Sequence, residues 1–309
     1  MGKRGLLVIK NRVESVLGCS LELVDVVKNN GVVLHGLRQK DGVVRPVVYI
    51  DILYQRYISG ELSLDDVVEE IVSCLNKSAS ADIGIRMGFL FDFSNARERI
   101  VYKLINYEKN KKMLMDAPHI RLLDLAIVFK LLPELEDECE DTEVSMIVTS
   151  DIARVWGNIS ADELFKLAEK NTPRLCGYEI SNIRDIVLGL LKAQCPDIDK
   201  SFLDTILGPE VVPMYILSNK TALDGAAALL YPDLLKDFSD AAGGNLLIIP
   251  SSVDEVILVP QNMGGEAVLM KDSIPLINES EVLPNKVLSD NLYYYNRDLN
   301  KITIYNEKQ

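Results

Sequence analysis

The sequence predicts an α+β protein, on the strength of two regions. Residues 212–260 alternate short aliphatic runs with helical patterns, in the order strand, helix, helix, strand, turn, strand. Residues 21–50 contain three apolar runs separated by turn signals, which is typical of an antiparallel meander. We therefore expect a small N-terminal three-stranded meander with helices, residues 1–79, followed by a larger mixed α/β sheet domain, residues 80–309.

The elements of the N-terminal unit follow from its turn and cap signals. A helix comes first, and turn signals at 28–31 and 40–42 divide the next region into strands Leu21–Val27, Val32–Leu37 and Val43–Ile50. Ser63 and Asp66 have the spacing of a capping box, so a helix begins there. Its buried stripe is predicted from helical spacing at Val67, Val68, Ile71, Val72 and Leu75. Small and polar residues at 76–80 indicate the linker.

The middle of the chain mixes basic and apolar residues. Asp92–Asn95 resembles a helix entry and predicts a helix over Ala96–Asn106. Leu122–Leu132 is read as a buried strand, although a helix fits nearly as well. Residues 134–143 carry seven carboxylates and should form an exposed loop, after which Val144–Thr149 is expected to be a strand.

The C-terminal half has clearer boundaries. Ser160 and Glu163 form a capping box, and Pro173 is expected to end the helix that follows. Gly243-Gly244 should end a later helix by adopting left-handed backbone. The other expected elements are strands Gly177–Ile180, Leu246–Ile249 and Val256–Val259, helix Ile183–Lys192, a helix over Glu266–Ile277 broken or kinked near Pro275, and a hairpin of Leu292–Asn296 with Ile302–Tyr305.

Two stretches have a similar order of elements. Val144–Ser150 and Val212–Asn219 are both strands that lead to two helices and a further strand. A weak duplication and a chance similarity between two α/β units explain this equally well.

Composition restricts the function. Lys and Arg number 33 against 46 Asp and Glu, and the net charge of -13 repels phosphate backbones and anionic lipid. The five cysteines form no C-x-x-C pair, which favours free thiols in a reducing compartment. Apolar runs are too short for a signal peptide or a membrane span. We expect a soluble cytoplasmic protein.

Several segments resemble a known family. They are Ile105–Asn110, Pro118–Ala126, Asn171–Arg174, Pro250–Ser252 with Glu255–Leu258, and Leu288–Asp290 with Tyr293–Tyr295. They are similar to the bacterial domain-of-unknown-function family 5688 over nearly the whole chain. More distantly, Trp156, Tyr215, Gly225–Ala227 and Pro250 resemble the YtpQ-like uncharacterised proteins. The resemblance implies a fold and a bacterial origin, and no reaction.

Catalytic candidates are few. His35 and His119 are the only histidines, which excludes a His-rich zinc site, and we expect no metal and no cofactor. His119 could act as a base oriented by Asp124, or could be structural. Ser251 or Ser252, just after a strand end, is the candidate nucleophile, but G-x-S-x-G is absent and a turn explains these serines as well. Cys176 lacks an identifiable base and is read as idle.

A basic, tyrosine-containing segment is the main binding candidate. Between Arg97 and Arg121, seven basic residues outnumber three acidic ones in a strongly acidic chain. Such a segment could hold an acidic partner or single-stranded nucleic acid, or could be a solvated helix face. The candidate binding residues are Arg97, Arg99, Lys103, Tyr107, Lys109, Lys111, Lys112 and Arg121, together with Asn219 in a loop.

We therefore predict a non-catalytic cytoplasmic binding or adaptor protein. Its contact surface would be the basic segment or the loops around Asn219 and Ser251, and its partner a protein. Nucleic acid is the less favoured partner because of the overall acidity, and no membrane contact is expected. The alternative is a hydrolase that uses His119 with a serine or a carboxylate.

Overall fold

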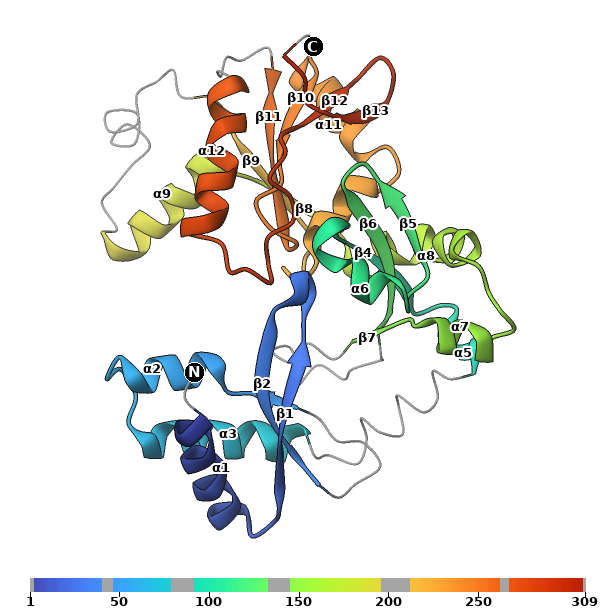
Figure 1. Cartoon of the computed structure of the whole chain (residues 1–309). Coiled ribbons are helices and arrows are strands. Elements are labelled where there is room, and N and C mark those ends of the chain that lie inside the picture. The colour runs from blue at the N-terminus through green and yellow to red at the C-terminus, as the bar shows by residue number, and fades with distance from the viewer. Residues whose placement is uncertain are drawn as a thin grey trace. The chain divides into compact units, whose positions relative to one another are not determined.

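The chain divides into two compact units, residues 1–92 and 93–309 (Figure 1). The computed structural model describes residues 3–40, 47–78, 92–132, 145–195, 212–261 and 267–307. The predicted boundary between residues 79 and 80 and the acidic stretch 134–143 lie outside the described residues. Both units combine antiparallel sheet with helices, so the α+β class is confirmed.

The first unit contains the predicted meander, a sheet of strand order β1-β2-β3 with antiparallel pairing (Figure 1). Helices α1 and α3 pack against each other, and α3 also contacts β3. The elements are α1 (Lys3–Leu17), β1 (Leu21–Val27), the 3-10 turn η1 (Asn29–Gly31), β2 (Val33–Gln39), β3 (Val48–Tyr49), α2 (Asp51–Ile58) and α3 (Leu64–Ser78).

The core of this unit follows helical spacing. Leu6, Ile9 and Val13 of α1 recur at three- and four-residue intervals and are almost fully buried. From α3 the core receives Val67, Val68, Ile71 and Leu75, four of the five predicted stripe residues. Burying one such side chain contributes roughly 1.5–3 kcal/mol.

The predicted capping box at the start of α3 is confirmed. The Ser63 N–H donates to Asp66 Oδ2 at 2.8 Å, and the Asp66 N–H donates to Ser63 Oγ at 3.2 Å. These two bonds satisfy backbone donors that the helix itself leaves open.

The second unit contains two sheets whose pairings are all antiparallel within the described residues. In the four-stranded sheet, β6 pairs with β4, β5 and β7, and the six-stranded sheet has the order β13-β12-β10-β11-β9-β8. The strands are β4 (Ile100–Asn106), β5 (His119–Leu122), β6 (Leu125–Leu131), β7 (Met146–Ile147), β8 (Glu179–Asn182), β9 (Tyr215–Ser218), β10 (Leu246–Ile249), β11 (Glu255–Pro260), β12 (Tyr293–Asn296) and β13 (Lys301–Ile304).

Helices and 3-10 turns surround these sheets (Figure 1). Helix α8 packs on β4, α9 contacts β8, and α12 contacts β10. They are α5 (Phe93–Ala96), η2 (Glu108–Asn110), α6 (Lys111–Leu114), α7 (Ser150–Val155), α8 (Ala161–Cys176), α9 (Ile183–Gln194), η4 (Gly225–Leu230), α11 (Leu234–Ala242) and α12 (Ala267–Ser280). Within the described residues, none of the helices is both long and apolar enough to cross a bilayer.

The predicted helix over Ala96–Asn106 is wrong. Helix α5 ends at Ala96, and residues 100–106 form β4, which pairs with β6 along its whole length. Residues such as Ile100, Val101 and Tyr102 favour strands, and sheet pairing overrides a helix entry signal nearby. The strand reading of the Leu122–Leu132 run is confirmed in β6, with a left-handed Leu123 turning the chain from β5.

Prolines end neither of two helices in which they occur. Helix α8 begins at the predicted capping box and continues through Pro173 to Cys176, where Gly177 adopts a left-handed φ of 58°. Helix α12 likewise runs through Pro275. A proline removes one backbone donor, and tertiary packing of the flanking turns offsets that loss.

The order of elements repeats, but their placement in the sheets does not. The series β7, α7, α8, β8 corresponds to β9, η4, α11, β10. However, β7 belongs to the four-stranded sheet and β8 to the six-stranded sheet, whereas β9 and β10 lie in one sheet on either side of β11. The predicted C-terminal hairpin is confirmed as β12 and β13.

Candidate functional site

The basic segment is divided by strand β4. Arg97 and Arg99 precede this strand and Lys109 follows it, and seven extended residues span roughly 24 Å. Lys103, within the strand, directs its ammonium group to the carboxylate of Asp224. The charge of the segment is therefore spread over three places.

The C-terminal part of the segment forms a surface around a tyrosine ring. The guanidinium carbon of Arg121 lies 4.4 Å from the centroid of the Tyr107 ring, and the His119 ring lies 6.0 Å from that centroid. The Arg121 Nε also donates to the Leu123 carbonyl at 3.3 Å. We define the Tyr107 surface as Tyr107, Lys109, Lys111, Lys112, His119 and Arg121.

Only part of the positive charge on the Tyr107 surface is paired. Lys109 Nζ lies 3.5 Å from Asp290, and Lys111 pairs with Glu108. Lys112 and Arg121 have no carboxylate oxygen within 4.0 Å among the described residues. The exposed pairs of Lys109 and Lys111 contribute little to stability. Because Lys112 and Arg121 lack such a pair among the described residues, their charges are available for contact with a partner.

Asp124 is a hydrogen-bond acceptor shared by three side chains. It accepts from Ser289 Oγ at 2.6 Å, Asn291 Nδ2 at 2.9 Å and the Tyr293 hydroxyl at 2.8 Å. Burial, together with the charge of Asp124, raises the pKa of Tyr293 well above its ordinary value. Asp124 thereby ties the turn before β6 to β12 and the residues that precede it.

The three catalytic candidates have separate partners. His119 Nδ1 lies 2.9 Å from the Ala117 carbonyl oxygen, and Ser251 Oγ donates to Glu255 Oε1 at 3.3 Å. Within the described part of the chain, no hydrogen bond joins any two of His119, Ser251 and Asp124.

Asn219 closes the loop between β9 and η4. Its side chain is buried, donates to the Leu223 carbonyl at 2.7 Å and accepts from the Thr221 N–H at 3.1 Å. The Ser251 loop meets this loop at Asp254, which accepts the Asp224 N–H at 2.9 Å. The two loops named as contact candidates therefore lie together, and Asn219 supports their shape.

This junction contains a buried ionic cluster. The Asp224 carboxylate accepts from Lys103 Nζ at 3.2 Å and from Lys130 Nζ. The side chains of Asp224, Lys103 and Lys130 are 6%, 17% and 7% exposed. Asp254 pairs at 2.8 Å with Lys286. We call these five residues the Asp224 centre.

The ammonium groups decide the ionisation of Asp224. Burial alone would raise the pKa of Asp224, but Lys103 and Lys130 outweigh that effect and lower the pKa to about 2. Asp224 is therefore ionised at neutral pH. Asp224 has a left-handed φ of 55°, and Ala222 in the same loop has a φ of 53°. Such backbone conformations persist only where the surrounding structure holds them, so the loop and the ion pairs together fix the position of Asp224.

The neighbouring titratable groups are neutral. Burial raises the pKa of the Cys176 thiol, and it raises the pKa of Tyr102 and Tyr231. The Tyr102 hydroxyl is buried and has no hydrogen-bond partner among the described residues. A thiol with a raised pKa is a poor nucleophile, because little thiolate is present at neutral pH.

Sequence reasoning missed most of this centre. It placed Lys103 on a surface and overlooked Lys130 and Asp224. A single lysine inside the apolar run of β6 was the available signal, because a buried ammonium group requires a carboxylate partner.

The first unit holds its histidine between two carboxylates. His35 Nδ1 lies 2.9 Å from Asp51 Oδ1, and His35 Nε2 lies 3.8 Å from Asp25. The His35 N–H also donates to Asp51 Oδ2 at 2.6 Å, which fixes the start of α2 on β2. In the part of the chain that is described, no three metal-ligating side chains come together.

The fold and the centre define an α+β protein in which a loop aspartate of one sheet neutralises lysines of another. Residues 7–297 match DUF5688, a family of unknown function, and the chain belongs to that family. The predicted resemblance to domain-of-unknown-function family 5688 is thus confirmed. No curated protein and no solved structure matches the chain.

Proposed function

We propose that this protein is a non-catalytic binding protein that holds an acidic segment of a protein partner on the Tyr107 surface. The observation that carries the proposal is the stacking of Arg121 on Tyr107, beside His119. Stacking restrains a long side chain before a partner arrives, so less conformational entropy is lost on binding.

The local charges support an acidic partner. Lys112 and Arg121 are exposed and have no carboxylate neighbour among the described residues, so each is accessible to a carboxylate of an acidic partner. The overall charge of -13 disfavours nucleic acid, whose affinity requires many phosphate contacts. The separate partners of Asp124, His119 and Ser251 also favour binding over hydrolysis.

The proposal includes a bacterial, cytoplasmic origin and a distant relationship to the YtpQ-like proteins. Free thiols support a reducing compartment. The free cysteines among the described residues are Cys19, Cys74, Cys176 and Cys195.

The test measures binding of a fluorescein-labelled decaglutamate peptide by polarisation. Arg121→Glu combined with Lys112→Glu should weaken binding at least about tenfold. Lys170→Glu, an exposed charge reversal on α8, is the matched control and should leave binding unchanged. An equal loss in the control, or tighter binding of labelled single-stranded DNA than of the peptide, would contradict the proposal.

The hydrolase alternative requires His119 and Ser251 to act together. It predicts that purified protein cleaves an activated ester and that His119→Ala and Ser251→Ala each abolish cleavage. A rate equal to that of the buffer, or one unchanged in both variants, removes this alternative.

A further inference from the structure

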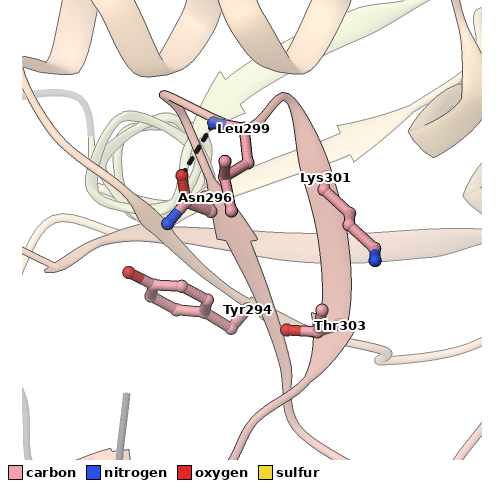
Figure 2. Close-up of a pocket in the computed structure, with 5 residues that line it drawn as sticks. All are labelled: Tyr294, Asn296, Leu299, Lys301 and Thr303. Atoms are coloured by element: carbon pink, nitrogen blue, oxygen red, sulfur yellow. Dashed lines mark hydrogen bonds between the residues drawn. The ribbon is translucent and has the colours of Figure 1, made fainter.

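A pocket of about 200 Å³ lies on the C-terminal hairpin, and none of its described lining residues belongs to the Tyr107 surface or to the Asp224 centre. Figure 2 shows its lining side chains, Tyr294, Asn296, Leu299, Lys301 and Thr303. In the hairpin register, Tyr294 pairs with Thr303 and Asn296 pairs with Lys301. Alternate residues of a strand share a face, so these four side chains project from the same side of the sheet.

The turn of the hairpin fixes the orientation of the amide in this pocket. Asn296 Oδ1 accepts from the Leu299 N–H at 2.9 Å, the bond drawn in Figure 2. The amide oxygen is therefore occupied, and the Asn296 Nδ2 group remains as a donor without a partner in the described structure.

Two further donors in the pocket have no partner in the part of the chain that the structure describes. The neighbouring tyrosines are engaged, since the Tyr293 hydroxyl donates to Asp124 and the Tyr295 hydroxyl donates to Asn300. Among the described residues, the Tyr294 hydroxyl has no such partner, and Lys301 Nζ has no carboxylate oxygen within 4.0 Å. Three donors that lack a partner among the described residues, one of them cationic, thus line one pocket.

The described lining residues also include apolar surface and no carboxylate. Tyr294 is largely buried, and Leu299, which is 71% exposed, offers an aliphatic wall. Lys301 supplies the one charge among the described lining residues, and this charge is positive, so the pocket favours an anion. The nearest carboxylate in the turn, Asp298, lies 3.8 Å from Arg297.

We propose that this pocket binds a small monocarboxylate that carries a compact apolar group. The carboxylate oxygens accept from Lys301 Nζ, Asn296 Nδ2 and the Tyr294 hydroxyl, and the apolar group packs between the Tyr294 ring and Leu299. The volume is smaller than the roughly 300–1,000 Å³ of drug-sized sites, which restricts the ligand to about a single ring or a short branched chain.

The experiment measures the binding of phenylacetate, and of 2-phenylethanol as its neutral analogue. Binding is monitored by two-dimensional NMR of the full chain. We expect shifts in the hairpin amides with a Kd on the order of 1 mM for phenylacetate, and at least about tenfold weaker binding of the alcohol.

The decisive variant is Asn296→Asp. It keeps an oxygen for the Leu299 N–H and replaces the Nδ2 donor by a second oxygen, so the turn is retained while the pocket gains a negative charge. Phenylacetate binding should weaken at least about tenfold, and Lys236→Met on α11 should leave it unchanged. Equal shifts by the acid and the alcohol, unaltered binding by Asn296→Asp, or shifts outside the hairpin would overturn the proposal.

Discussion

Removing the charge of Asp224 should destabilise the second unit strongly. Asp224→Asn keeps the size of the side chain but leaves Lys103 and Lys130 without a neutralising carboxylate in a site where the Asp224 side chain is only 6% exposed. Breaking a buried ion pair by removing one partner costs about 3–5 kcal/mol. The shift in the pKa of Asp224 from 3.8 to about 2 gives a separate, lower value of about 2 kcal/mol for the contribution of the ionised carboxylate to stability.

The assay is urea unfolding at pH 7, monitored by tryptophan fluorescence. Trp156 is the only tryptophan of the chain, it is buried in the second unit, and its ring lies 5.6 Å from that of Phe93. The matched control is Asp240→Asn, which removes an exposed partner of Lys236 and should leave the midpoint nearly unchanged. A decrease in the free energy of unfolding of less than about 1 kcal/mol for Asp224→Asn would show that the Asp224 centre does not stabilise the second unit as proposed.

The same variant predicts a pH dependence. Because the pKa of Asp224 is lowered on folding, its stabilisation is present above the unfolded value of 3.8 and is lost as the pH falls through about 2. The stability difference between the original chain and Asp224→Asn should therefore shrink by about 2 kcal/mol between pH 6 and pH 2. A constant difference over this range would show that the carboxylate charge is not the cause.

Three further outcomes are expected. Gly225→Ala should lower the unfolding free energy by about 2 kcal/mol or more in the same urea assay, because a Cβ there would lie 2.3 Å from the Asp254 carbonyl oxygen; an unchanged midpoint would contradict this. Folding raises the pKa of Tyr293, so the contribution of Tyr293 to the free energy of unfolding should be present below about pH 10 and lost above it. Tyr293→Phe should therefore reduce the fall in stability at alkaline pH. In a thiol-reagent titration, exposed Cys74 should react at once and buried Cys176 only after unfolding, and fast modification of both would disprove the burial argument.

Local patterns were sufficient wherever the chain satisfies its own backbone groups. The capping boxes at Ser63 and Ser160 and the hairpin at 293–304 were predicted because their donors and acceptors are only a few residues apart. The helix predicted over Ala96–Asn106 failed because the partner of β4 is β6, some twenty residues later in the chain.

The candidate sites show the same division. Stacking of Arg121 on Tyr107 joins the end of β4 to β5, two strands close in the chain, and the sequence placed both residues in one basic segment. The bond between Asp124 and Tyr293 joins residues 169 positions apart, and no local pattern indicates it. Asp124 therefore looked like a partner for nearby His119, whereas its three donors come from the C-terminal part of the chain.

The sequence by itself determined the α+β class, the family, the acidic charge and most element boundaries, because periodicity and turn chemistry act over a few residues. Only the tertiary structure decided that Lys103 points to Asp224 instead of to solvent, that Lys130 completes that cluster, and that the Asn219 and Ser251 loops meet at Asp254. The physical reason is that a buried charge takes its partner from whichever segment folding brings within a few ångströms, regardless of its place in the chain.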